Sequence, residues 1–250
     1  GLRAAPEVRF EGEAATRSFV PRKFWENFPS CLELRDTQVT WHLFPKETEL
    51  QPGEAKTWVG DIGLSEPRAS FAYNAAYIDE ASALLGCRVS VVNELSDLLD
   101  NNMSGPGSFY RKREVCDEYG WRNFGELYAD HEAMHAEGKD IFVSHYNNQY
   151  DPVWGFSLRF LSTGDDRWQE LMADLAQHVV DIDLYKTDRD KVEYNNGLFW
   201  HTDHYLPALT ATHRTYSRNH NSAYEGHQGG GGPGGQHCYS SGLALRYLLS

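Results

Sequence analysis

Apolar and polar residues alternate along the first part of the chain, roughly residues 1–66. The segments that follow this two-residue period predict β-strands, and they read VRFEGEA, SCLELRD, QVTWHLFP and EAKTWVGDIGL. Turn signals at residues 28–30 and 51–53 separate them, and Val39, Trp41 and Leu43 fall on one face of a strand. Because these strands follow one another without an intervening helix, we predict that residues 1–66 are part of an antiparallel β-sandwich.

After Pro67 the apolar residues recur at helical spacing. The pattern predicts a helix from Ala69 to Leu85, ended by Gly86, and a second helical stretch over Val91–Leu99. Residues 101–108 are predicted as a loop, and residues 111–151 as loop-rich.

From Pro152 onward, the sequence GFSLRFLSTGDDRWQELMADLAQHVVDIDL predicts two amphipathic helices joined by a short turn. Gly164 is the predicted C-cap of the first helix and Asp165 the N-cap of the second. Helix hairpins of this kind are the repeating unit of α/α toroids. We therefore predict a mainly α fold, with an α/α toroid over residues 67–250. The chain ends in what looks like an unfinished helix, so we expect a fragment of a longer protein with an incomplete toroid.

The stretch from Tyr194 to Tyr216, YNNGLFWHTDHYLPALTATHRTY, is unusually dense in imidazole, phenol and hydroxyl groups. With Asp203 as N-cap and Pro207 in the first turn, a helix would place Tyr205, Thr212 and Tyr216 on one face. Such groups bind sugar hydroxyls and transfer protons. The alternative, that they are satisfied polar residues at a helix interface, stays open. The candidates here are Trp200, His201, His204, Tyr205, His213 and Arg214.

A second polar-aromatic cluster, SHYNNQYD, spans Ser144–Asp151. A run this polar needs hydrogen-bond partners if it is buried, so it forms either a pocket wall or a set of loop caps. Arg122, like Arg214, can neutralise a carboxylate. The glycine-rich stretch 226–235 lacks the features of a phosphate-binding loop and is interpreted as a connector or as backbone close to a ligand. The candidates in the cluster are His145, Tyr146, Asn147, Asn148 and Tyr150.

Three other charged motifs have simpler interpretations than a metal or substrate site. Residues 131–135 spell HExxH, the zinc-peptidase signature, but the surrounding charges and Gly138 disfavour a buried metal-binding helix. The acidic run 181–193 is interpreted as a solvated loop rather than a calcium site, because the EF-hand spacing is missing. Residues 111–113, Arg-Lys-Arg, are interpreted as a solvated face.

Composition narrows the classes of partner. The net charge of −13 argues against binding to nucleic acid or an anionic membrane, and no apolar run is long enough to span a bilayer. An acidic substrate would have to be received by a local basic pocket. Aromatic residues make up 13% of the chain, which suits stacking on sugar rings. The 4 cysteines show no CxxC spacing, so neither zinc–thiolate binding nor a disulfide framework is expected.

Several motifs together resemble the family of exo-acting rhamnogalacturonan lyases and YetA-like proteins. The segments that carry the resemblance are GW-R-NFG-ELYADHE, VSHYNNQYD, STGDDRW, HVVDIDLY, YNNGLFWHTDHY, THRTYS and GGGGPGGQH-YSSGLAL. It implies that residues 1–66 are the end of a β-sandwich domain and residues 67–250 a truncated α/α toroid. It also implies a polysaccharide lyase that acts on pectic, rhamnogalacturonan-like glycans, with a secreted or periplasmic location favoured by that substrate.

A lyase that acts on a uronic acid needs a base, an acid and a group that stabilises the carboxylate. Our hypothesis is that His145 or His204 is the base and Tyr146 or Tyr205 the acid. The hypothesis assigns the following groups to substrate binding: Asn147, Asn148, Arg122, Arg214, His201, His213 and His237, with Tyr150, Trp154 and Trp200 stacking on sugar rings.

We expect an acidic poly- or oligosaccharide as the partner and no cofactor, with a calcium ion as the alternative; the oligomeric state stays open. Two alternative functions stay open. One is a glycoside hydrolase using Asp151 with Asp203 or Glu132, and the other is a non-catalytic carbohydrate-binding domain.

Overall fold

The computed structural model describes part of the chain. The described residues are 3–12, 16–48, 50, 53–63, 94–129, 144–145, 151–184, 186–189, 192, 195–197 and 240–248. The predicted helix Ala69–Leu85 and most of Tyr194–Tyr216 therefore lie outside them.

The chain divides into two compact units, each described here by itself. The sheet unit comprises Gly1–Gln51, Lys56–Ala72 and Tyr119–Phe124, and the helical unit comprises Pro52–Ala55, Tyr73–Glu118 and Gly125–Ser250. This division departs from a single boundary after residue 66, because residues 52–55 group with the helices and residues 119–124 with the strands.

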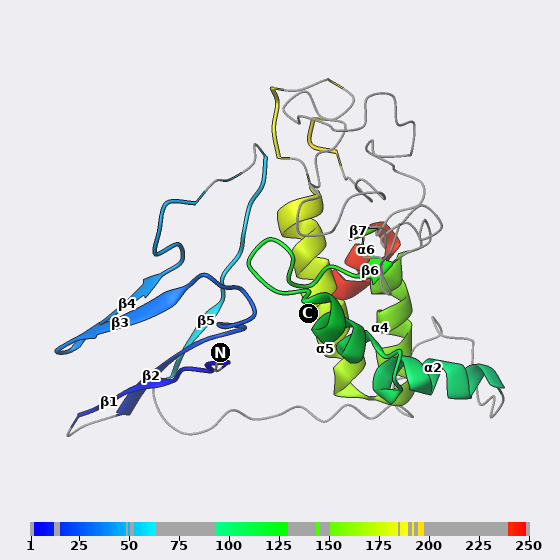
Figure 1. Ribbon diagram of the computed structural model, residues 1–250, viewed down its shortest axis with the longest axis horizontal. Helices are drawn as coiled ribbons and strands as arrows, with labels where there is room; N and C mark the ends of the chain where they lie inside the picture. The colour runs from blue at the N-terminus through cyan, green and yellow to red at the C-terminus, as the bar shows by residue number, and fades with distance from the viewer. Residues whose placement is uncertain are drawn as a thin grey trace. The chain divides into compact units, whose positions relative to one another are not determined.

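The sheet unit contains a three-stranded antiparallel sheet of order β1-β2-β5 and a separate β3–β4 hairpin (Figure 1). Its strands are β1 (Val8–Glu11), β2 (Thr16–Pro21), β3 (Cys31–Arg35), β4 (Gln38–His42) and β5 (Gly60–Gly63). Phe19 of β2 is the central position of the larger sheet, since it pairs with Val8 on one side and Ile62 on the other.

Alternation in the sequence predicted β1, β3 and β4, and the structure confirms these three strands. Strand β2 was not predicted, although its partner β1 was. The prediction for residues 54–64 was too long, because among its described residues only Gly60–Gly63 forms a strand. Residues 53–55 instead bond within the helical unit, where Ala55 N donates to Asp181 O over 3.0 Å. The described strands do not establish a sandwich, which stays a prediction.

Segment Tyr119–Phe124 completes the sheet unit through backbone bonds and aromatic packing. Gly120 N donates to Glu26 O over 2.7 Å, and Trp121 N donates to Phe28 O over 2.9 Å. The Tyr119 ring lies 4.6 Å from the Trp25 ring, measured between centroids. This short piece of chain is therefore held by the strand region despite its distance in sequence.

The helical unit contains five described helices, a short strand pair and a π-helical turn. They are α2 (Glu94–Ser104), α3 (Phe109–Cys116), β6 (Tyr128–Ala129), β7 (Ser144–His145), α4 (Pro152–Thr163), α5 (Asp166–His178), η3 (Val179–Asp183) and α6 (Ser240–Leu248). The buried core includes Val153 and Phe160 of α4 and Leu171, Met172 and Leu175 of α5.

Helices α4 and α5 form the predicted hairpin and lie side by side (Figure 1). Gly164 adopts the left-handed conformation at φ 68°, and its N–H donates to Phe160 O over 2.7 Å. The Asp165 carboxylate accepts from Arg167 N over 3.0 Å, as an N-cap does. The hairpin and both caps are therefore confirmed. No ring of helix pairs is identified within the described residues, so the toroid stays a prediction.

Two loop predictions are wrong in part. Helix α2 continues to Ser104, because Met103 is buried in the helical core. Helix α3 occupies part of the stretch predicted as loop-rich; its N-cap is Ser108, whose hydroxyl oxygen accepts from Arg111 N over 3.2 Å. Together with the strands, these helices make the described part of the chain a mixture of α and β structure; the mainly α fold of the whole chain stays a prediction.

Candidate functional site

The N-terminus of α4 is fixed by the carboxylate of Asp151. Its Oδ1 atom accepts from Trp154 N over 3.1 Å, as expected of an N-cap, and its Oδ2 atom accepts from Gly242 N in α6 over 2.8 Å. A Cβ atom at position 242 would collide with this carboxylate. Glycine is therefore required there, and one side chain ties together the first turns of α4 and α6.

The structure describes residues near both ends of the SHYNNQYD cluster. On one side, β7 pairs with β6, with Tyr128 opposite His145. On the other side, Asp151 begins α4. Residues 146–150 connect these two points, and His237 precedes the first residue of α6 by three positions. The SHYNNQYD cluster therefore ends at the start of α4.

Three of the predicted site residues fall on described parts of the chain. Trp154 lies in the first turn of α4 and is 38% exposed, which leaves its ring accessible for stacking. Arg122 belongs to the sheet unit, and its guanidinium lies 4.8 Å from the centroid of the Trp121 ring. For His145 the structure gives the backbone, in β7.

The remaining predicted site residues lie outside the described residues, so the convergence of the two clusters stays a prediction. They are Tyr146, Asn147, Asn148, Tyr150, Trp200, His201, His204, Tyr205, His213, Arg214 and His237.

A second constellation, not predicted from the sequence, lies inside the helical unit. The ligand-type atoms of Glu126, His178 and Asp183 all lie within 4.8 Å of one another. The His178 Nε2 atom is 3.2 Å from Glu126 Oε2 and 3.7 Å from Asp183 Oδ1. The three side chains are between 0% and 2% exposed. We call this group the buried triad.

The π-helical turn η3 explains why two members of the buried triad meet. His178 and Asp183 are five residues apart, which in an α-helix places them roughly 140° apart around the axis. A π-helix bonds residue i to residue i+5, and Leu184 N donates to Val179 O over 3.1 Å in this pattern. The wider turn brings Asp183 back to the side of the helix that carries His178.

Glu126 reaches the triad because the preceding glycine lets the chain pack directly on α5. Gly125 has φ +95°, and a Cβ atom there would collide with the carbonyl of Asp174 and approach the His178 side chain. Leu127 N donates to Glu126 Oε1 over 2.9 Å, which orients the carboxylate so that its other oxygen faces His178.

Two interpretations of charged motifs are wrong in part. Asp181 and Asp183, predicted as members of a solvated acidic loop, are each 1% exposed; Gln177 Nε2 donates to Asp181 Oδ1 over 3.0 Å. Arg113, predicted on a solvated face, is buried because it pairs with Asp174 at 3.0 Å. Asp188 is exposed, as expected.

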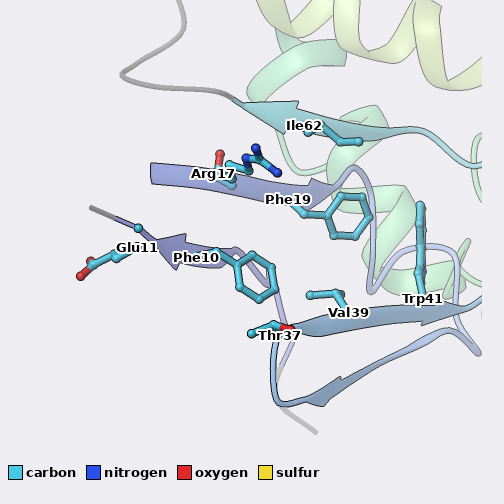
Figure 2. A pocket seen from close by; sticks show the side chains of 10 residues that line it. Phe10, Glu11, Arg17, Phe19, Thr37, Val39, Trp41 and Ile62 are labelled. Atoms are coloured by element: carbon cyan, nitrogen blue, oxygen red, sulfur yellow. The ribbon is translucent and has the colours of Figure 1, made fainter. Parts of the chain in front are cut away.

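The sheet unit contains an apolar hollow with a volume of about 960 Å³. Figure 2 shows the Phe10, Phe19 and Val39 side chains pointing toward one another between the three-stranded sheet and the β3–β4 hairpin. Trp41 stands at one end, with its ring edge-on to Phe19 at 5.8 Å between centroids. These aromatic residues offer surface of the kind that carbohydrates stack on.

Comparisons with known proteins add no relative: no family model, curated protein or solved structure matches this chain. Among the helices that the structure describes, none has the length and apolar character needed to cross a bilayer.

Proposed function

We propose that this chain is a carbohydrate-active protein, a polysaccharide lyase that cleaves a uronic-acid-containing, pectic glycan by β-elimination. The observation that carries the proposal is the Asp151 carboxylate, which joins the starts of α4 and α6. Through this joint, Asp151, the last residue of the SHYNNQYD cluster, and the start of α6 meet at the first turn of α4, which carries the exposed side chain of Trp154. The proposal expects the imidazole, phenol and amide groups of the cluster to gather near this turn.

These groups match the chemistry that β-elimination requires. The base removes the proton at C5, the acid protonates the leaving oxygen, and amide or guanidinium groups stabilise the enolate-like carboxylate. In the proposal His145 or His204 is the base and Tyr146 or Tyr205 the acid. Asn147, Asn148 and Arg214 hold the carboxylate, and Trp154 stacks on a sugar ring. The resemblance to rhamnogalacturonan lyases supports the same substrate class.

The structure weighs against a hydrolase mechanism that uses Asp151. Both of its carboxylate oxygens accept hydrogen bonds from backbone N–H groups. A general acid must carry a proton on one of those oxygens, and protonation would weaken the hydrogen bonds that the carboxylate accepts at the helix start. Asp151 therefore has a structural role, which favours the lyase over a hydrolase built on this residue.

The test is to incubate the full chain with rhamnogalacturonan and follow the ultraviolet absorbance of the unsaturated product. One of the two histidines His145 and His204 is the proposed base. We therefore expect either His145→Ala or His204→Ala to reduce the rate by about 100-fold or more. The matched control is His42→Ala, which changes a histidine of β4 in the sheet unit that pairs with Glu33. If both site variants keep the full rate, the assignment is wrong; sugar release without unsaturated product indicates a hydrolase.

A second candidate function, carbohydrate binding without turnover, is favoured by the hollow of the sheet unit. There Phe10, Phe19 and Trp41 line an open apolar surface. Under this alternative, oligosaccharide binding measured by calorimetry falls in Trp41→Ala and is unchanged in His145→Ala, and no product forms. Under the lyase proposal, His145→Ala reduces product formation and Trp41→Ala leaves it unchanged.

A further inference from the structure

We propose that the buried triad, Glu126, His178 and Asp183, is a binding site for one divalent transition-metal ion of the zinc or manganese type. Ligands that share an ion at bond lengths of about 2.0–2.2 Å lie roughly 3.0–3.5 Å apart. The distances from His178 Nε2 are 3.2 Å to Glu126 Oε2 and 3.7 Å to Asp183 Oδ1. The first distance falls within that range and the second exceeds it by a few tenths of an ångström, and all three ligand atoms lie within 4.8 Å of one another.

Charge balance in the buried space favours a divalent ion. With a neutral imidazole, the two carboxylates carry two negative charges, which one divalent cation offsets completely. With a protonated His178 and no ion, these three groups keep one negative charge in excess. All three side chains are at most 2% exposed, so water screens the attraction between a divalent ion and these carboxylates only weakly.

The donor set selects the class of ion. Calcium and magnesium take oxygen ligands, whereas an imidazole nitrogen suits zinc and other first-row transition ions. The two carboxylates also suit manganese. None of the three donors is a thiolate, so copper(I) and iron–sulfur clusters do not fit. The three donors leave at least one coordination position for a further ligand.

The burial of the triad points to a structural role for the ion. Glu126 lies on the segment that leads into β6, whereas His178 and Asp183 belong to the end of α5 and to η3. An ion here would fasten that segment to the helix, and β6 in turn pairs with β7 at Tyr128 and His145. The site goes beyond the proposed lyase activity, since its ligands are separate from the proposed catalytic groups.

The test measures metal binding, so it does not depend on turnover. The full chain is stripped with a chelator, dialysed, and titrated separately with Zn²⁺, Mn²⁺, Ca²⁺ and Mg²⁺, with bound metal counted by elemental mass spectrometry. We expect one transition ion per chain. Glu126→Gln and Asp183→Asn keep the side-chain size and should weaken binding by at least about 100-fold, since even the loss of an outer-shell partner weakens it by about 10- to 100-fold.

The matched control is Asp181→Asn. This carboxylate is as buried as Asp183 and lies on the same turn, but it accepts from Gln177 and is not part of the triad. We expect this variant to bind metal as the parent chain does. A second control, His131→Ala, removes the first histidine of the HExxH motif and should also leave binding unchanged.

X-ray absorption spectroscopy of the zinc-loaded parent chain makes the test independent of how well the variants fold. One imidazole nitrogen with carboxylate oxygens supports the triad. Two imidazole nitrogens place the ion on the HExxH motif and overturn the proposal. Absence of stoichiometric transition metal, binding of calcium or magnesium alone, or full binding by Asp183→Asn overturns it as well.

Discussion

The two units of this chain differ in how far their charged side chains are exposed to solvent. In the sheet unit, the described ion pairs are open to solvent; the side chains of Arg22 and Asp61 are 56% and 28% exposed. In the helical unit, Arg113 and Asp174 pair at 6% and 7% exposure. Every charged side chain found buried among the described residues belongs to the helical unit: Arg113, Glu118, Glu126, Asp174, His178, Asp181 and Asp183.

The packing of the two units explains the contrast. The helical unit has a continuous core of buried side chains along α4 and α5, and a core of this kind supplies the free energy that holds charged groups away from water. The described residues of the sheet unit bury few side chains, and many of its contacts are between aromatic rings. The buried ionisable groups of the described residues therefore lie where this core can hold them.

The largest expected difference between the units concerns their ion pairs. Arg113→Met leaves the buried Asp174 carboxylate without its guanidinium, and we expect the free energy of unfolding to fall by about 3–5 kcal/mol. Arg22→Met breaks the exposed pair with Asp61 and should cost at most about 1 kcal/mol. Urea denaturation followed by circular dichroism measures both. Equal losses would contradict the contrast drawn between the units.

Core packing provides the next comparison. Leu175 in α5 is 0% exposed, whereas Leu34 in β3 is 58% exposed. Leu175→Ala leaves a cavity and should lower the free energy of unfolding by about 2–5 kcal/mol. Leu34→Ala should change it by no more than about 0.5 kcal/mol. The same denaturation experiment applies, and a large loss for Leu34→Ala would show that the sheet unit depends on this side chain.

The close contact between the Glu126 segment and α5 can be tested by adding a methyl group at either of two glycines, one without space for it and one with space. Gly125 has φ +95° and no room for a Cβ atom. Gly125→Ala should therefore lower the free energy of unfolding by about 2–4 kcal/mol through strain and collision. Gly155 lies in α4 with open space around it, so Gly155→Ala should raise the free energy of unfolding by about 0.5–1 kcal/mol. Thermal unfolding distinguishes the two signs directly.

The smallest expected effect depends on pH. Burial raises the pKa of Tyr110, and the hydrogen bond from its hydroxyl to Glu170 Oε2, 2.7 Å long, raises it further. Because the folded-state pKa is the higher one, this contribution to stability is complete below the unfolded pKa of about 10. It is lost as the pH rises above that value.

Tyr110→Phe should cost about 1 kcal/mol at neutral pH through the lost hydrogen bond, and it should flatten the decline of stability above about pH 10. Unfolding measured across the alkaline range tests this expectation. Tyr247→Phe is the control, because Tyr247 is 79% exposed. An unchanged alkaline decline in Tyr110→Phe would refute the assignment.

The local fold was predictable where one period dominates the sequence. The strand containing Val39 and Trp41 follows from two-residue alternation, and the α4–α5 hairpin follows from apolar spacing together with Gly164 and Asp165. Helix α3, FYRKREVC, escaped prediction because half of its residues are charged and form one continuous run. Its buried Arg113 is explained by Asp174, a partner that no local pattern reveals.

The candidate site was predictable only in part. The density of polar and aromatic groups identifies the SHYNNQYD cluster, but nothing in the sequence joins it to α6; the Asp151–Gly242 hydrogen bond does so in the structure. The buried triad was missed for a geometric reason. In an α-helix with 3.6 residues per turn, His178 and Asp183 would lie on different sides of the axis. The π-helical turn that brings them to the same side has no distinct sequence signal.

The bond between Asp151 and Gly242 also bears on how the protein is made. Its two residues are 91 positions apart, so during translation α4 emerges from the ribosome long before the partner that completes its first turn. Contacts of such large sequence separation slow folding, since a long stretch of chain must close before they form. Until α6 arrives, one flank of α4 stays uncovered, and the nascent helical unit depends on the α4–α5 hairpin to keep its apolar surface out of water.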